Sequence, residues 1–383
     1  MIAVMRASIA LIIAAFGYLG WFIARRLTEP VQPRRFELTI RGVEAQDATS
    51  RVILDRTEQT STRGIYNLWC EGGAWVALTP EVEHRGAVLI ARTATCTQLD
   101  ALPRTGERAS WSGIYYSTPT DAGLDPENIV IDTPPGAAPA WLFRGDRATW
   151  AIHIHGLGSS RAGTLRGVVT TSRLGYTSLS VTFRNGREGP PTGNRRSTLG
   201  VTEVNDVEEA IGYAVRHGAQ RLILFGWSMG GAIALQLADR SPHRHLIAGL
   251  VLDSPVLDWV EVIKANCSRS NVPSLLGGCA IPWLTIRPLA RIIGLPTTVP
   301  LRSFDWIERA NDLAVPVLIL HGTGDSFVPL RLSQELEARR SSLVEVVSFE
   351  AGHTLAWNSD PSRWHRVVAD WLTRQIAQPN PSG

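Results

Sequence analysis

Strand-like and helix-like patterns alternate along the chain from Trp141 to its end. Short apolar runs, typical of buried strands, are separated by segments in which apolar residues recur every three or four positions, as in a helix packed on a sheet. The expected strands are 150–154, 178–183, 222–225, 247–252, 317–320 and 344–349, and the expected helices are 164–174, 201–216, 230–238, 330–340 and 364–376. This order predicts an α/β fold over 140–383, with a mostly parallel sheet flanked by helices. The segment 255–310, rich in Pro, Gly, Leu and Trp, breaks the alternation and is expected to form a cap.

The preceding region, 36–139, has a different pattern. Short β-type runs are separated by turn residues, and no helical period is sustained. The expected strands are 36–40, 51–54, 64–69, 75–78, 87–91, 113–117 and 129–131. We therefore expect a separate β-rich N-terminal region that ends near residue 139.

Residues 1–30 are dominated by an uncharged stretch of 18 residues, Ala7 to Ala24, with Arg6 before it and Arg25 and Arg26 after it. As a helix, this stretch would be about 27 Å long, barely enough to cross a bilayer. A cleaved signal peptide needs small residues at the cleavage site, whereas bulky residues stand at positions 21–23. We expect a single-pass membrane anchor. A cleaved signal peptide and a buried helix are the alternatives.

The arginines and the cysteines point to opposite sides of the membrane for the body of the protein. Arginines 25, 26, 34 and 35 follow the apolar stretch, and the positive-inside tendency places such a flank in the cytoplasm. The four cysteines form two local pairs, Cys70 with Cys96 and Cys267 with Cys279, which would suit disulfides in an oxidising compartment. Four buried free thiols are an equal alternative. The sequence leaves the side of the membrane, the disulfide state and the oligomeric state open.

Composition indicates a packed globular body. Hydrophobic residues make up 44% of the chain and charged residues 19%, with 13 Trp. The formal net charge is only +3, and the arginines are scattered among acidic residues rather than gathered on one predicted face. This distribution argues against a nucleic-acid partner.

The sharpest chemical signal is Gly226-Trp227-Ser228-Met229-Gly230, which lies between an apolar strand and an Ala-rich helix. A serine in such a tight strand-to-helix turn projects its hydroxyl from the sheet edge, and the flanking glycines let neighbouring backbones pack closely. The sequence therefore predicts Ser228 as a nucleophile. The alternative is a plain glycine-rich turn.

A serine hydroxyl needs a base, and the base needs an orienting acid. His353 follows the last expected strand, and Asp325 follows the strand before it, which gives the chain order Ser, acid, His. We expect His353 to be the base and Asp325 the acid. Asp253, at the end of another strand, is the rival acid, with a role as an end-of-strand cap as its alternative.

The turn His155-Gly156-Leu157-Gly158 follows the first strand of the alternating region. We expect the backbone N–H groups of Leu157 and Met229 to form an oxyanion hole. His153 and His155 share a strand face, but no Cys or carboxylate nearby completes a metal set, so structural hydrogen bonds are expected for them. No metal or cofactor is predicted.

Together, the motifs around Gly156, Ser228, Asp253, Asp325 and His353 resemble the α/β-hydrolase superfamily, in particular its capped esterase, lipase-like and serine peptidase-like members. The resemblance covers about Ala140 to the C-terminus and implies a serine hydrolase with an acyl-enzyme intermediate. The apolar cap and anchor favour a small-molecule ester or acyl-lipid substrate. A peptidase or acyltransferase on the same triad is the second hypothesis, and an inactive membrane-tethered binding module is the third.

Overall fold

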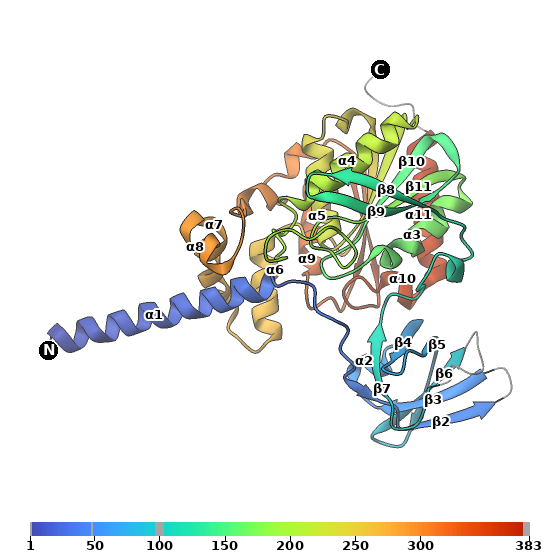
Figure 1. Cartoon of the computed structure of the whole chain (residues 1–383), viewed down its shortest axis with the longest axis horizontal. Helices are drawn as coiled ribbons and strands as arrows, with labels where there is room; N and C mark the ends of the chain where they lie inside the picture. The colour runs from blue at the N-terminus through green and yellow to red at the C-terminus, as the bar shows by residue number, and fades with distance from the viewer. Residues whose placement is uncertain (1, 47–48, 96–102, 378–383) are drawn as a thin grey trace.

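The computed structural model describes residues 2–46, 49–95 and 103–377, in which a long N-terminal helix precedes a β-barrel and an α/β domain (Figure 1). The α/β sheet has eight strands in the order β15-β14-β13-β12-β10-β11-β9-β8. Its six parallel strands are β10 (Asp146–Ile154), β11 (Tyr176–Val181), β12 (Arg221–Trp227), β13 (Ile247–Asp253), β14 (Val317–Gly322) and β15 (Val344–Phe349). The α/β-hydrolase fold class expected from the sequence is confirmed.

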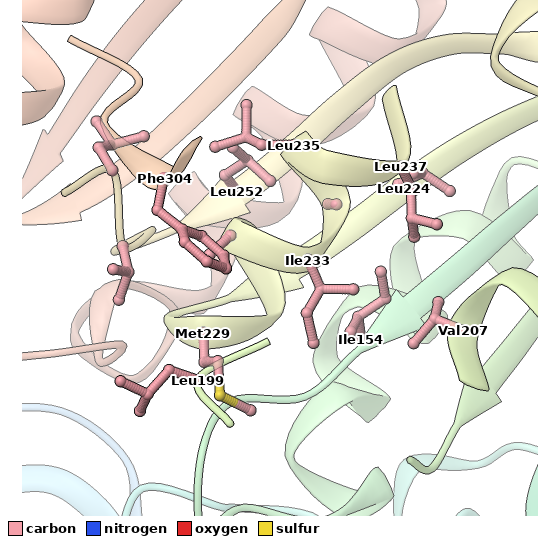
Figure 2. Close-up of a cluster of buried hydrophobic side chains, with 14 of the residues drawn as sticks. Ile154, Leu199, Val207, Leu224, Met229, Ile233, Leu235, Leu237, Leu252 and Phe304 are labelled. Carbon is pink, nitrogen blue, oxygen red and sulfur yellow. The ribbon is translucent and has the colours of Figure 1, made fainter. Parts of the chain in front are cut away.

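Helices cover both faces of this sheet, which is why β12 and β13 are apolar over nearly their whole length. In β12, Leu222 and Leu224 face one core, whereas Ile223 and Phe225 face the other. The first core is covered by α4 (Glu203–Arg216), α5 (Met229–Arg240) and α9 (Leu330–Arg339), and the second by α10 (Ala356–Ser359) and α11 (Pro361–Ala377), with α3 (Leu165–Arg173) packed against α11. Figure 2 shows the α5 side of the first core, where Ile233 lies close to Ile154 of β10.

The antiparallel hairpin of β8 (Glu127–Thr133) and β9 (Gly136–Phe143) belongs to this sheet, because β9 pairs with β11. The expected boundary at residue 140 lies within β9. The edge strand β8 is mostly exposed and lies in a stretch rich in Pro, Gly and Asp, so its hydrophobic signal is weak. The expected strand at 113–117 is wrong: this segment is the link between the two domains.

The N-terminal strands form an antiparallel sheet in the order β1-β7-β4-β5-β6-β3-β2. The strands are β1 (Leu38–Thr39), β2 (Gly42–Gln46), β3 (Thr49–Asp55), β4 (Tyr66–Cys70), β5 (Trp75–Arg85), β6 (Leu89–Thr95) and β7 (Arg108–Ser112), with the short helix α2 (Glu58–Ser61) after β3. Ile40 N–H donates to Glu107 on the β7 side, and Arg41 N–H donates to Ile53 on the β3 side. The continuous segment from β1 to β2 is thus hydrogen-bonded to β7 through its first half and to β3 through its second half. It closes the sheet into a barrel, residues 38–112.

The expected cap segment is helical. It contains α6 (Trp259–Arg269), the 3-10 helix η5 (Ser274–Ala280), α7 (Ile281–Thr285) and α8 (Arg287–Ile293). Cys267 and Cys279 lie in this segment as free thiols, and burial raises the pKa of Cys267. Cys70 is also a free thiol, buried in the barrel, while its suggested partner Cys96 lies outside the described residues.

Helix α1 (Ile2–Leu27) projects from the body over its N-terminal half and packs on the cap over its C-terminal half (Figure 1). Gly20, Ala24 and Thr28, spaced four residues apart, are buried against the body. A Cβ on Gly20 would lie 2.0 Å from the carbonyl oxygen of Cys279, so only glycine allows this approach. Within the described residues, α1 is the one helix long and apolar enough to cross a bilayer, as a membrane anchor or a signal sequence would be.

Candidate active site

Ser228 occupies a strained turn between β12 and α5. Its backbone has φ 52° and ψ −115°, a conformation that L-residues rarely adopt. The flanking glycines are required by close contacts: a Cβ on Gly230 would lie 2.2 Å from the carbonyl oxygen of Ile154, and one on Gly226 would lie 2.6 Å from the backbone of Gly231. The turn therefore holds the Ser228 hydroxyl at the carboxyl edge of the sheet.

His353 and Asp325 approach Ser228 from two neighbouring loops. His353 Nε2 lies 2.9 Å from Ser228 Oγ, and His353 Nδ1 lies 2.7 Å from Asp325 Oδ2. The backbone of Gly324 donates to the carbonyl of Ala351 at 2.9 Å, which ties the two loops together. The three residues singled out from the sequence thus form one continuous hydrogen-bonded chain.

The Asp325 carboxylate is held by donors on both oxygens. Its Oδ1 accepts from the N–H groups of Phe327 and Val328, each at 2.9 Å. Its Oδ2 also lies 3.3 Å from Nε2 of His321. Burial alone would raise the pKa of Asp325, but the bonds from His321, His353 and Val328 outweigh it and hold the pKa well below its ordinary value. Asp325 is therefore an anion facing the imidazole.

His321 is a residue of this site that sequence reasoning missed. It lies at the end of β14, fully buried, with Nδ1 2.8 Å from Ser333 Oγ and Nε2 3.0 Å from the carbonyl oxygen of Val328. Its position four residues before Asp325 was visible in the sequence. Its contact with the acid depends on how the loop folds back.

The rival acid, Asp253, does not join the chain. It ends β13 beside the elbow, where its backbone carbonyl accepts from Ser228 N–H at 3.0 Å. Neither carboxylate oxygen of Asp253 has a hydrogen-bond partner among the described residues. Burial raises the pKa of Asp253, and the nearby Arg166 opposes this shift. His353 Nδ1 is hydrogen-bonded to Asp325 and not to Asp253.

The two expected oxyanion donors flank the serine. Met229 is the first residue of α5, and its side chain is fully buried, while Leu157 lies in the turn after β10. Gly156 brings this turn to the elbow, since a Cβ there would lie 3.3 Å from Ser228 Cβ. Within the described part of the chain, neither the N–H of Leu157 nor that of Met229 has a backbone acceptor.

His153 and His155 point into the core instead of forming a site. His155 stacks on Phe183 with ring centroids 4.1 Å apart, and its Nδ1 lies 2.9 Å from the carbonyl oxygen of Gly156. Burial lowers the pKa of His155 to about 4 and that of His153 to about 3, so both rings are neutral at pH 7. Among the described residues, no group of three or more His, Cys, Asp or Glu is placed to hold a metal ion.

Comparison with known proteins agrees with this fold. The sequence model of the Alpha/beta hydrolase family matches residues 140–370, more than half of the chain. The chain belongs to the α/β-hydrolase family. A second model, a domain of unknown function (DUF8805), matches residues 39–112, which is the barrel of this hydrolase.

Individual relatives are more distant. An uncharacterized protein of Mycobacterium tuberculosis (strain ATCC 25618 / H37Rv) is 29% identical over 59% of this chain and 62% of its own length. Pimeloyl-[acyl-carrier protein] methyl ester esterase of Aromatoleum aromaticum is 26% identical over 30% of this chain and 60% of its own. The hydrolase therefore spans about 60% of the length of these curated relatives. The esterase Pf2001 of Pyrococcus furiosus shares the fold, with a TM-score of 0.52 at 21% identity, covering 67% of this chain and 94% of that one.

The barrel of the hydrolase forms one wall of a cleft that contains the His353 loop. The cleft has a volume of about 830 Å³. Its apolar and aromatic lining comes from both domains: Leu38, Tyr66 and Trp111 of the barrel, and Phe327, His353 and Leu355 of the α/β domain. Phe327 also stacks on the His353 ring, with centroids 5.4 Å apart. The sequence assigned no role to residues 36–139, and the structure places part of them at the site.

Asn358 fixes the barrel in this position. Its Nδ2 donates to the carbonyls of Ile65 at 2.7 Å and Gly113 at 2.9 Å, and its own carbonyl accepts from Ile65 N–H at 2.9 Å. Asn358 follows His353 by five residues and lies in α10, so the helix next to the loop that carries the imidazole also carries the barrel contact. Nothing in the local sequence marks this asparagine, because its partners are 245 and 293 residues away.

Proposed function

We propose that this hydrolase cleaves carboxylic esters by serine catalysis, with Ser228 as nucleophile, His353 as base and Asp325 as orienting acid. The observation that carries the proposal is the pair of hydrogen bonds at His353, 2.9 Å to Ser228 Oγ and 2.7 Å to Asp325 Oδ2. Nucleophile, base and orienter within hydrogen-bond reach are the arrangement that such catalysis requires.

In the first step, Ser228 Oγ attacks the ester carbonyl carbon while His353 Nε2 takes the hydroxyl proton. The N–H groups of Met229 and Leu157 stabilise the developing oxyanion, supported by the N-terminal end of α5. Collapse of the tetrahedral intermediate passes the proton from His353 to the departing alcohol and leaves an acyl-enzyme. Water, deprotonated by His353, then releases the acid and restores Ser228. The ionised Asp325 fixes the His353 tautomer and stabilises the imidazolium in both steps.

The cleft favours a substrate with an apolar acyl chain. Its lining combines the apolar side chains of Leu38, Trp111, Phe327 and Leu355 with polar ones that include Glu58, Arg269 and Glu350, in a space large enough for a medium-sized ligand. We infer that the apolar part of this lining takes the acyl chain of a fatty-acid ester or an acyl-lipid. The barrel then contributes to substrate selectivity by lining one side of the cleft, which the α/β domain alone would lack.

We further propose that α1 is a retained membrane anchor. Arg196 Nη1 donates to the carbonyl of Arg25 at 2.8 Å and to Thr28 Oγ1 at 3.1 Å, and Ser197 N–H donates to Thr28 at 3.2 Å. Cleavage after an N-terminal signal would remove most of the helix that makes these contacts. The small residues Gly20 and Ala24 extend the same packed face along the cap, as small residues do between closely packed helices.

Labelling with a fluorophosphonate probe tests the catalytic proposal. The purified wild-type chain should be labelled, and Ser228→Ala and His353→Ala should abolish labelling. Ser348→Ala is the matched control, because Ser348 is exposed on β15 outside the cleft and should leave labelling unchanged. Turnover of p-nitrophenyl esters should rise with acyl length, while a peptide amide should be cleaved far more slowly. Full labelling of Ser228→Ala, or a preference for the peptide, would contradict the proposal.

A further inference from the structure

The cap has an unusual charge distribution. Between Glu261 and Asp305 the sequence contains no acidic residue, yet it contains Lys264 and the arginines at 269, 287, 291 and 302. In the described parts of the cap, neither Arg287 nor Arg291 forms an ion pair, and both are exposed. An exposed segment with basic residues and no acidic ones favours an anionic partner.

Large apolar side chains are exposed in the same segment. Leu275 of η5 is 84% exposed, Ile292 of α8 is 61% exposed, and Ile286, just before α8, is 49% exposed. Outside α1, the remaining exposed large apolar residues of the described chain either stand singly on loops and strands or belong to the site region. In this short segment, the exposed Ile286 and Ile292 are next to the exposed Arg287 and Arg291, a mixture of apolar and basic side chains that is typical of an element at a membrane interface.

This surface lies next to the anchor. Elements η5, α7 and α8 all contact α1, and the Gly20 contact with Cys279 holds α1 against the cap. Figure 1 shows α7 and α8 on the side of the body toward which the free half of α1 projects. A bilayer crossed by α1 would therefore meet this part of the body first.

A basic hollow lies between the cap and the loop that contacts α1. It has a volume of about 340 Å³, and its lining includes Arg196 and Arg291 together with Asn185 and Asn194 and no carboxylate. Arg196 also binds the C-terminal end of α1, so the hollow lies where the anchor enters the body. Arg196 Nη1 is engaged with the end of α1, and both ends of the Asn185 amide are hydrogen-bonded within the protein. The exposed guanidinium of Arg291 is therefore the group of this hollow that suits the phosphate of a lipid headgroup.

We propose that the cap surface formed by η5, α7 and α8 docks on a bilayer rich in anionic lipid, with Leu275, Ile286 and Ile292 at the acyl boundary and Arg287 and Arg291 on the phosphates. This inference rests on the proposed anchoring by α1, and it is independent of the catalytic proposal. The cap begins directly after β13, where Val256 N–H donates to the Ser228 carbonyl at 3.2 Å. Docking would therefore fix the orientation of the nucleophile-bearing edge relative to the lipid.

The experiment places an environment-sensitive NBD fluorophore on Ile292→Cys in the full chain, reconstituted in nanodiscs. The matched control is Val130→Cys, which is 57% exposed on β8, outside the cap. Unsubstituted protein gives the background from the native thiols. In discs that contain phosphatidylglycerol, emission at 292 should shift to the blue and be quenched by nitroxide lipids, while emission at 130 should not change. Arg287→Glu with Arg291→Glu should reverse the shift at 292.

Three results would overturn the inference. The first is solvent-like emission at 292 both in discs that contain phosphatidylglycerol and in discs of pure phosphatidylcholine. The second is a blue shift of equal size in the two kinds of disc. The third is a blue shift without lipid that grows with protein concentration, which would assign the surface to a second copy of the chain. Failure of the protein to stay in the disc would instead contradict anchoring by α1. Fluorophosphonate labelling of Ser228 on the same samples reports the catalytic proposal separately.

Discussion

Replacement of Asp325 by Asn is the sharpest test of the proposed triad, because the hydrogen bonds dictate how the amide must orient. In the wild type, Oδ1 accepts from two backbone N–H groups, of Phe327 and Val328. The amide oxygen of Asn must keep this position, since an NH₂ group there would face two donors. The NH₂ group is then directed at His353 Nδ1, which in the wild type lies 2.7 Å from Oδ2.

An NH₂ donor facing Nδ1 favours the His353 tautomer that carries its proton on Nε2. That tautomer cannot take the proton from Ser228, so kcat should fall by about 10⁴-fold, or about 5.4 kcal/mol of transition-state stabilisation. Asp253→Asn should change kcat by less than about 10-fold, because neither of its oxygens has a hydrogen-bond partner in the described chain and its contribution to the imidazolium is a longer-range charge effect.

The assay is the initial rate of hydrolysis of a soluble short-chain p-nitrophenyl ester, with circular dichroism to establish that each variant is folded. Rates are normalised to the concentration of folded protein, because fluorophosphonate labelling itself depends on the triad. A folded Asp325→Asn enzyme with nearly wild-type kcat would refute the reasoning. So would a loss in Asp253→Asn as large as the loss in Asp325→Asn.

Three further predictions concern stability and the barrel. Because the pKa of Asp325 is depressed in the fold, its stabilising contribution is present above the ordinary carboxyl pKa of about 4 and is lost as pH falls below it. In urea unfolding between pH 6 and pH 3, the free energy of unfolding should therefore fall more steeply with pH for wild type than for Asp325→Asn. Equal slopes of this free energy against pH would contradict the prediction. Arg92→Met should lower the free energy of unfolding by about 3–5 kcal/mol, because buried Arg92 donates to four main-chain carbonyls of the barrel. An unchanged urea midpoint would show that these four hydrogen bonds do not stabilise the barrel. Asn358→Ala should lower the free energy of unfolding by about 2–4 kcal/mol, because the carbonyls of Ile65 and Gly113 lose their donor. The same substitution should raise KM for long-chain esters more than KM for acetate esters. An equal effect on all esters would argue against a role of the barrel in substrate selection.

The sequence by itself determined the α/β domain and its candidate chemistry, because the signals are local. The apolar strands, the glycine-flanked Ser228 and the glycine turns before Asp325 and His353 each require a particular backbone within a few residues. The parallel sheet then brings the carboxyl ends of its strands to one edge, so chain order alone placed the three residues together. The choice between Asp325 and Asp253 was less secure, since both end buried strands, and it depends on hydrogen bonds that only the folded loops provide.

Only the tertiary structure decided how the remaining parts meet. The barrel wall of the cleft depends on Asn358, whose partners are hundreds of residues away, and the edge hairpin of β8 and β9 gained its place by pairing with β11. The packing of α1 on the cap depends on the close contact between Gly20 and the Cys279 backbone, which a hydropathy pattern does not predict. Such contacts are set by the packing of whole elements, so no short stretch of sequence specifies them.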